Sequence, residues 1–366
     1  MCLKITSSLL NSQRNARTRG RCQTTRPLRQ FNDSALRYFV DPPRRANLRY
    51  GYERWIRRPD ERGRLDSLLR AYVRVLDKPP PDVGSLSAGV VSWRGIMTKI
   101  LTAPYEERDG WELNVMELNG TLYLEEHLTN VQLLEKNDMK PQHHLQSYYG
   151  YAFESWCTAD APDARPGWGG DVNTNVQWCS VVKTRLGDTR IVIGGEVDCV
   201  RGGYSGANDS MVELKTSMSI RGPQDEARFE KKLLKFYIQS FLLGVPEIVV
   251  GFRTPKGELT ALQTFKTMQI PRMVRGKPGT WNPQICLAWG DQFLTWLRAH
   301  VGRGDATEVP AVWRVSFVPR TGVKLVRLDE TGVSDVVNGD DRYGFLPTWY
   351  WERAREALTA PSQPGT

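Results

Sequence analysis

The chain has 366 residues, of which 40% are hydrophobic, and a formal net charge of +9. No apolar run approaches the roughly 20 residues that cross a bilayer, so the sequence predicts no membrane segment. The six cysteines form no CxxC pair and only four histidines are present, which argues against a zinc ribbon, a disulfide framework and a histidine-based metal site. The positive charge favours a polyanionic partner, nucleic acid first, although a basic surface that only aids solubility would explain it equally well.

The two ends of the chain differ from its middle. Residues 1–30 contain seven Lys or Arg and no Asp or Glu, so we interpret 1–28 as a basic, disordered arm. Such an arm is typical of three cases: contact with phosphates, mitochondrial targeting, or no function at all. Residues 357–366 are expected to form a flexible tail. Nothing between these ends has the composition of a linker, so residues 29–356 are expected to form one compact domain.

The predicted elements between these ends include both helices and strands. Apolar spacing and turn residues predict, in chain order, a helix over 62–76, a hairpin over 111–127 that turns at Asn119-Gly120, an element of undecided type over 149–157, two strands within 176–201 that turn at Gly187-Asp188, a strand over 211–219, an amphipathic helix over 225–245 and a buried strand over 247–254. The succession of three strands, a helix and a strand predicts an α/β fold, in which a mixed β-sheet is flanked by helices.

Charged residues alternate with apolar ones in "GGEVDCV" and "MVELKTS". Residues i and i+2 of a strand point to the same face, so Glu196 and Asp198 are expected to lie side by side, as are Glu213 and Lys215. The Gly- and Ser-rich segment between the two runs allows both strands to lie adjacent, as in one hairpin. Four charged groups would then converge on one face of a sheet.

Such a cluster predicts a metal site. Buried carboxylates repel one another, and a divalent cation offsets both the repulsion and the cost of burial. Oxygen ligands without His or Cys favour Mg²⁺ or Mn²⁺, and a neighbouring lysine suits hydrolysis of a phosphodiester. The alternative is that these residues face solvent from an ordinary antiparallel sheet. An ExD, an ExK about 15 residues later and then an amphipathic helix is, however, the pattern of the PD-(D/E)xK nuclease superfamily.

Flanking motifs narrow this superfamily. Between about Arg29 and about Trp351 the chain contains, in order, "NLRYGYERWIRR", "VVSWRGIMTKIL", "YYGYAFESWC", "GGEVDCV", "VELKTS", "KFYIQSFLLGV" and "GFRT". On these motifs the chain resembles the DXO family of decapping and 5′-end-processing nucleases, which includes the fungal nuclear cofactor of the large 5′→3′ exoribonuclease. The resemblance implies a single compact domain of PD-(D/E)xK nuclease-like α/β fold, with the metal site in a deep cleft.

The resemblance also assigns roles to individual residues. It implies the following metal ligands: Glu154, Glu196, Asp198, Glu213 and the backbone carbonyl of Leu214. It implies that Lys215 and Gln239 hold the attacking water and the scissile phosphate, with Glu196 also in the catalytic set. It implies contacts to the RNA from Arg29, Glu53, Trp93, Arg94, Gly95, Cys179, Glu196, Lys215 and Gln239. Simpler alternatives exist, such as an exposed helix position for Glu154, a helix flank for Gln239 and a small buried side chain for Cys179.

The resemblance implies hydrolysis at RNA 5′ ends with one or two Mg²⁺ or Mn²⁺ ions. The expected reactions are removal of pyrophosphate from 5′-triphosphate RNA and removal of incomplete or atypical caps (unmethylated or NAD-type), with 5′→3′ exoribonuclease activity as a further option. Two alternatives stay open: a DNA-directed nuclease of the same fold, and a largely non-catalytic cofactor that stabilises a large 5′→3′ exoribonuclease. The nucleus is the expected compartment, with the cytoplasm as the alternative.

Overall fold

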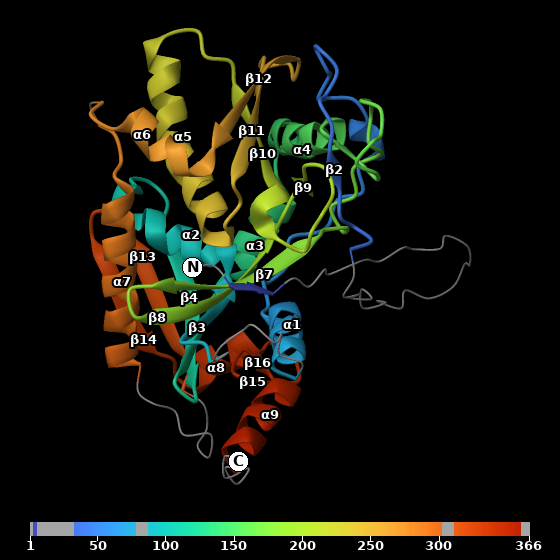
Figure 1. Ribbon diagram of the computed structural model, residues 1–366. Coiled ribbons are helices and arrows are strands. Elements are labelled where there is room, and N and C mark those ends of the chain that lie inside the picture. Colours follow the sequence, from blue (N-terminus) through green and yellow to red (C-terminus); the bar gives the residue numbers. More distant parts are fainter. Residues whose placement is uncertain (1–2, 6–32, 78–86, 278, 302–310, 360–366) are drawn as a thin grey trace.

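Most strands of the protein belong to two mixed sheets (Figure 1). The computed structural model describes residues 3–5, 33–77, 87–277, 279–301 and 311–359. The first sheet has eight strands in the order β1 (Leu3–Ile5), β7 (Cys179–Leu186), β8 (Thr189–Glu196), β3 (Val90–Trp93), β5 (Thr121–Glu126), β4 (Trp111–Leu118), β13 (Trp313–Val318) and β14 (Gly322–Arg327). β3 runs parallel to β5 and β8, whereas the other neighbours are antiparallel.

The second sheet lies above the first in Figure 1. Its six strands follow the order β12 (Leu259–Lys266), β11 (Glu247–Arg253), β10 (Met211–Met218), β9 (Cys199–Val200), β2 (Tyr38–Phe39) and β6 (Thr158–Ala159). β10 and β11 are parallel, as are β2 and β9. A two-stranded sheet of β15 (Arg342–Tyr343) and β16 (Leu346–Pro347) completes the set described.

Helices cover both sheets. Those described are α1 (Asp66–Asp77), α2 (Arg94–Thr102), α3 (Asn130–Asn137), α4 (Pro141–Trp156), α5 (Pro223–Leu243), α6 (Ile270–Val274), α7 (Pro283–His300), α8 (Glu330–Val337) and α9 (Thr348–Thr359). In Figure 1, α4 and α5 flank β10 and β11. Residues of α4 share one apolar cluster with Leu214 and Val249. Residues of α5 share another apolar cluster with Ile248 and Val250. The predicted mixed α/β fold flanked by helices is therefore confirmed, with its strands divided between two such sheets.

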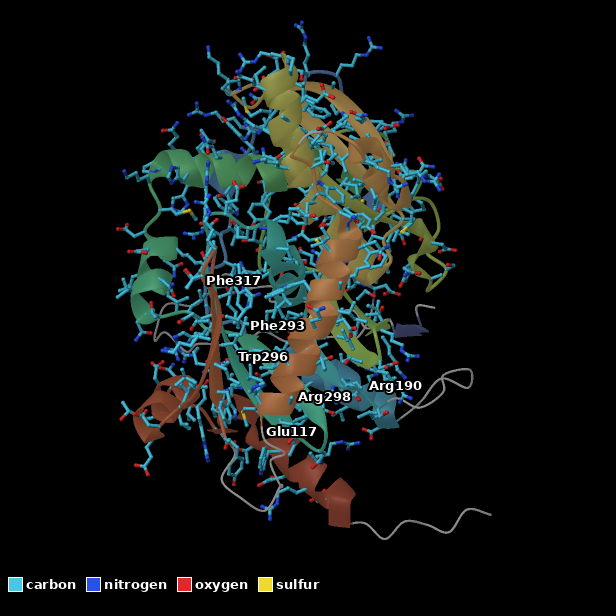
Figure 2. All side chains as sticks on the ribbon, turned by 90° about the vertical axis from the view of Figure 1, so that its left-hand side faces the viewer. Glu117, Arg190, Phe293, Trp296, Arg298 and Phe317 are labelled. Atoms are coloured by element: carbon cyan, nitrogen blue, oxygen red, sulfur yellow. The ribbon has the colours of Figure 1, made fainter. Side chains whose placement is uncertain are left out.

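α7 covers a face of the first sheet. Figure 2 labels Phe293 and Trp296 on this helix and Phe317 on a strand of the sheet. The ring of Trp111 on β4 lies 6.0 Å from that of Phe293 and stacks at 5.2 Å on that of Phe317, so three aromatic rings join helix and sheet.

Within the described residues, every helix is too short or too polar to span a bilayer.

Several of the local predictions are confirmed. Asn119 and Gly120 join β4 to β5 with φ of 53° and 78°, which is the left-handed pair that a type I′ turn requires. β7 and β8 form the hairpin expected around Gly187-Asp188, α5 forms within two residues of the helix expected over 225–245, and α1 forms four residues later than the start expected for the helix over 62–76. The undecided segment 149–157 lies almost entirely in α4, where Tyr149 and Phe153 are buried one turn apart.

The hairpin expected between the two carboxylate strands forms only between β9 and β10, and the placement of Glu196 in it is wrong. Glu196 ends β8 in the first sheet, and Cys199 begins β9 in the second, so the chain changes sheets between the two. The true neighbour of β10 is β9, with Val212 opposite Cys199. The two-residue period that placed Glu196 beside Asp198 holds only while one strand continues, and here the strand ends at Glu196.

A buried polar network lies beside the junction of β3 and α2. Glu125 on β5 is 1% exposed, and its Oε1 accepts a 2.9 Å hydrogen bond from Arg64 Nη1. Arg64 also donates to the carbonyl of Val336 and accepts at its own carbonyl a hydrogen bond from Trp93 Nε1. The second oxygen of Glu125 is buried without a hydrogen-bond partner. The network therefore fixes Trp93, the residue that precedes α2, at the cost of an unsatisfied carboxylate oxygen.

Glu125 should make stability depend on pH. Burial outweighs the attraction of Arg64 and raises the pKa of Glu125 from 4.5 to about 7. The folded state then keeps a proton that the unfolded state releases, so this residue lowers stability progressively as the pH rises from about 4.5 to about 7. Glu125→Gln keeps an oxygen for Arg64 and should reduce the loss of unfolding free energy between about pH 5 and 8 by about 1–3 kcal/mol. Urea unfolding across that range measures it, with the exposed Glu107→Gln as control; a profile unchanged from wild type would contradict the expectation.

Candidate functional site

Glu213 lies at the centre of the candidate site. Its side chain is fully buried on β10, where Oε2 accepts a 2.8 Å hydrogen bond from Arg94 Nη1 and Oε1 a 2.5 Å hydrogen bond from Lys215 Nζ. Burial alone would raise the pKa of Glu213, but the attraction of Arg94 and Lys215 outweighs it and lowers the pKa to about 2. Glu213 is therefore an ionised carboxylate held between two cations.

Three further carboxylates lie within electrostatic reach of this ion pair. Glu154 on α4, Glu196 at the end of β8 and Asp198 after it are each partly exposed. Burial raises the pKa of Asp198 from 3.8 to about 7, and repulsion by Glu213 adds to it. Burial, followed by repulsion from Asp198 and Glu196, raises the pKa of Glu154 well above its usual value. The structure thus brings together all four acids expected from the sequence, although they come from three separate segments.

Hydrogen bonds hold two of these acids, Asp198 and Glu196, in place. The backbone N–H of Leu214 donates a 2.6 Å hydrogen bond to Asp198 Oδ2, which ties the chain between β8 and β9 to β10. Gln177 Nε2 donates to Glu196 Oε2 at 3.0 Å. Arg94 begins α2 directly after β3, and a Cβ on the neighbouring Gly195 would approach the Cβ of Arg94 to 2.9 Å. Only glycine at this position lets the two segments approach so closely.

Two residues of this site were not expected from the sequence. Gln177 orients Glu196, and the pKa of Tyr151 is raised to about 12 by its burial and by the charges of Glu154 and Glu196. Tyr151 lies three residues before Glu154 on α4. Residues at this spacing are neighbours on a helix surface, so "YGYAFE" predicts that Tyr151 lies beside Glu154 if the segment is helical. No local pattern singles out Gln177.

The charges of the site fit a divalent cation. Four carboxylates lie around two cationic side chains, and three of the carboxylates have raised pKa values, first because of burial and then because neighbouring carboxylates repel their negative charge. A cation bound among oxygen ligands would relieve that repulsion. As the side chains lie, no group of three His, Cys, Asp or Glu residues within the described ranges forms a metal-holding set, and Glu213 is already engaged by Arg94 and Lys215. Metal binding therefore requires side-chain rotation, and the assignment of the four ligands and of the Leu214 carbonyl stays a prediction.

Three further predicted site residues, Cys179, Gln239 and Glu53, lie on separate elements. Cys179 is buried on β7 directly opposite Glu196, so it borders the carboxylates. Gln239 is on α5, partly exposed, and its side chain makes no hydrogen bond with any described residue. Glu53, by contrast, is exposed in the short 3₁₀ turn Tyr52–Arg54, where its charge acts on Tyr148. The contacts to RNA expected for these residues stay predictions.

The arginine-glycine motif is divided between structural and site roles. Trp93 donates its indole N–H to the Arg64 carbonyl and packs its ring against Gly194, so it supports the start of α2. Arg94 points to Glu213, and a Cβ on Gly95 would meet no atom within 4 Å, which leaves this turn of backbone accessible. Arg29 lies outside the described residues.

Glu213 and Lys215 on one strand, with further carboxylates converging on them and helices on both faces of the sheet, define the PD-(D/E)xK nuclease class. The chain belongs to the RAI1-like PD-(D/E)XK nuclease family, whose model matches residues 23–351. A decapping nuclease RAI1 of Mycosarcoma maydis is 39% identical, over 84% of this chain and 78% of the relative. The human decapping and exoribonuclease protein is 37% identical, over 91% of this chain and 84% of the relative.

Solved structures agree with this family. The crystal structure of Scheffersomyces stipitis Rai1 matches with a TM-score of 0.76 and 27% identity, and covers 89% of this chain and 91% of that chain. The crystal structure of Candida albicans Rai1 in complex with pU5-Mn²⁺ matches with a TM-score of 0.75 and 26% identity, with the same shares of both chains. The recognition of the DXO family from its motifs, and of the PD-(D/E)xK fold, is thereby confirmed.

Proposed function

We propose that this protein is a divalent-metal-dependent hydrolase of RNA 5′ ends. Its reactions would be the removal of pyrophosphate from 5′-triphosphate RNA and of incomplete or atypical caps, unmethylated or NAD-type. The observation that carries the proposal is the cluster of four carboxylates around Lys215 and Arg94, in which Glu213 accepts hydrogen bonds from both cations and Asp198 accepts one from the Leu214 N–H. Relatives named for decapping, and a relative solved with pU5 and Mn²⁺, support RNA as substrate and Mg²⁺ or Mn²⁺ as the ion.

The cationic residues of the site suit a phosphate. Burial would lower the pKa of Lys215, but attraction by Glu213 and Asp198 outweighs it and raises the pKa, so this lysine is an ammonium that donates hydrogen bonds. It therefore holds a phosphate oxygen or the attacking water, and it does not act as the base. Gln239, whose amide has no partner among the described residues, is available for the same task.

Glu196 is the best-placed acceptor for a proton. Its Oε2 accepts a hydrogen bond from Gln177 Nε2, which orients the carboxylate. Water would attack the phosphorus in line with the bond that breaks, and Glu196 would take the water proton as the leaving phosphate departs. A divalent ion among the carboxylates would supply charge stabilisation for the phosphate oxygens.

The double variant Glu196→Ala/Asp198→Ala tests this function. Wild type is expected to release pyrophosphate from 5′-triphosphate RNA and the cap nucleotide from GpppN-capped RNA with Mg²⁺ or Mn²⁺ present. The double variant should lose on the order of 10²–10⁴-fold in rate, because it lacks both the proton acceptor and a predicted metal ligand. Product analysis by chromatography measures both reactions.

The control exchanges two exposed acids, as Glu107→Ala/Asp188→Ala, and should keep the wild-type rate. Full metal-dependent activity in the Glu196→Ala/Asp198→Ala protein would contradict the site. Equal hydrolysis of a matched 5′-triphosphate DNA would instead favour the DNA-directed nuclease.

We also propose a nuclear location and association with a large 5′→3′ exoribonuclease. Both come from the resemblance to the DXO family, which includes the fungal nuclear cofactor of that enzyme. Co-purification of the two proteins from mixed, purified components tests the association, with the Glu196→Ala/Asp198→Ala protein showing whether binding is independent of catalysis. Failure to co-purify at micromolar concentrations would leave a stand-alone enzyme.

A further inference from the structure

The hairpin of β13 and β14 forms an edge of the first sheet and carries only positive charge. Residues 313–328 contain no Asp or Glu, and their cations are Arg314, Arg320, Lys324 and Arg327. Arg314 Nη1 lies 3.8 Å from Glu112 Oε2. The other three are exposed, and none of their side chains forms an ion pair or a hydrogen bond with any residue that the structure describes. Uncompensated cations along an edge attract a polyanion.

Arg320 lies in the turn between the two strands, with its backbone in the left-handed region. Its φ is 64°, and Val318 pairs with Gly322 across the turn. A Cβ makes this conformation costly, so glycine or asparagine is usual there. Charges on an edge strand discourage pairing with another chain, but this reason does not apply to a residue outside the strands. A strained arginine whose guanidinium has no partner among the described residues therefore points to a use of its charge.

The hairpin and the candidate site lie at the same end of the first sheet. Strand registers join Ile193 on β8 to Arg327 on β14 in one transverse row, through Ser92, Leu124, Val115 and Trp313. Glu196 follows Ile193 by three residues, and Lys324 precedes Arg327 by three. Because β8 and β14 run in opposite directions, both steps lead to the same end of the sheet, and Glu196 and Lys324 lie level with each other.

The distance along this row is long enough for several nucleotides. Five steps between neighbouring strands separate β8 from β14, which at about 4.8 Å a step gives about 24 Å. Stacked nucleotides advance about 3.4 Å along a strand, so about seven of them span this distance, and a more extended strand needs fewer. Two acids along the row have partners, since Glu112 accepts a 2.7 Å hydrogen bond from Ser316 Oγ and Glu126 pairs with Lys99. The uncompensated charge at the far end of the row is therefore positive.

We propose that Arg320 and Lys324 bind phosphates in the body of an RNA whose 5′ end occupies the candidate site. The proposal rests on the proposed function for the identity of the polyanion. Phosphate oxygens accept hydrogen bonds from both a guanidinium and an ammonium group. The protein then prefers a 5′-end substrate that is long enough to reach β14 over a dinucleotide, which ends before it.

Binding without turnover tests this surface independently of hydrolysis. A 3′-fluorescein-labelled, 20-nucleotide 5′-monophosphate RNA is titrated in EDTA across a series of salt concentrations with wild type, Lys324→Glu and Lys256→Glu. Lys324→Glu should weaken binding about fivefold and reduce the slope of log K against log salt by about 0.7, the value for one phosphate contact on a single strand. Lys256→Glu is the matched control, because Lys256 is an exposed lysine between β11 and β12 that forms no ion pair within the described residues. Equal losses in the two variants, or none in Lys324→Glu, would overturn the proposal.

Arg320→Gly separates a role in binding from a role in folding. Glycine adopts the left-handed backbone without strain, so this variant should unfold at the same urea concentration as wild type or at a higher one. Its affinity for the 20-nucleotide RNA should nevertheless fall about threefold, because a phosphate loses a cationic partner. Unchanged affinity in Arg320→Gly would overturn the assignment of Arg320 to the surface.

A kinetic arm separates this proposal from the proposed function. The ratio of kcat/KM for a 20-nucleotide 5′-triphosphate RNA to kcat/KM for a 5′-triphosphate dinucleotide should fall about fivefold in Lys324→Glu and keep the wild-type value in Lys256→Glu. An equal loss of kcat/KM for both lengths in Lys324→Glu would overturn the proposal. If wild type hydrolyses neither RNA, the proposed function fails, and the titration in EDTA still decides whether the hairpin binds RNA.

Discussion

Asp198→Asn is expected to abolish metal-dependent hydrolysis and, at the same time, to stabilise the metal-free protein. The side chain of Asp198 accepts a hydrogen bond from the Leu214 N–H, and the amide oxygen of asparagine can accept the same bond. What the substitution removes is a negative charge that burial and Glu213 make unfavourable. Because Asp198 keeps some exposure to solvent, the gain in unfolding free energy should be about 1–3 kcal/mol at pH 8. Activity should fall on the order of 10²–10³-fold.

The gain in stability should depend on pH in a defined direction. The pKa of Asp198 is raised from 3.8 in the unfolded chain to about 7 in the folded one. Between these values the folded state holds a proton that the unfolded state has released, so wild-type stability falls as the pH rises and the full cost is reached above about pH 7. The advantage of Asp198→Asn should therefore be absent near pH 4 and largest near pH 8.

Urea unfolding in EDTA at a series of pH values measures the effect, with activity followed on 5′-triphosphate RNA. Asp188→Asn serves as control, because Asp188 is a fully exposed carboxylate whose exchange should change stability by less than about 0.5 kcal/mol. Mn²⁺ should stabilise wild type and leave Asp198→Asn little changed. Lower stability of Asp198→Asn at pH 8 in EDTA would show that the carboxylate is compensated without metal.

The central pair of the site was predictable from the sequence because it lies within a single strand. Glu213 and Lys215 occupy alternate positions of β10, and the two-residue period places their side chains on one face in any strand. The same rule failed for Glu196 and Asp198, since the chain leaves one sheet and joins another between them. The alternation of apolar and polar residues predicts that a strand is present. It does not predict where the strand ends if apolar residues continue beyond the end.

Contacts between distant segments were beyond the reach of local patterns. The bond from Arg94 to Glu213 joins residues 119 positions apart, and its existence depends on α2 starting beside the end of β8. Glu154 and Gln239 came from resemblance to a family, because nothing in their own helices marks them as polar members of a site.

Glu213→Gln should abolish activity like Asp198→Asn but change stability in the opposite direction. Glu213 is the acid that Arg94 and Lys215 neutralise, and its exchange leaves two buried or half-buried cations without their closest carboxylate. Breaking such a pair from one side typically costs 3–5 kcal/mol, and we expect about 3 kcal/mol because Asp198 and Glu196 still attract Arg94. The lowered pKa of Glu213, about 2 against 4.5 in the unfolded chain, means that its contribution is complete above about pH 4.5 and is lost as the pH falls towards 2.

A double-mutant cycle separates this ion pair from a general loss of packing. If Arg94 and Glu213 stabilise each other, Arg94→Met/Glu213→Gln should be less destabilised than the sum of the single variants by about 1–3 kcal/mol, measured by urea unfolding at pH 7.5 in EDTA. Additive losses would mean that each residue acts through its packing alone. We expect Asp198→Asn to raise the free energy of unfolding and Glu213→Gln to lower it, with activity lost in both. This result requires that the positive charges of the site neutralise Glu213 and leave the charge of Asp198 uncompensated unless a cation binds. Equal destabilisation by the two variants would refute that division of the acids.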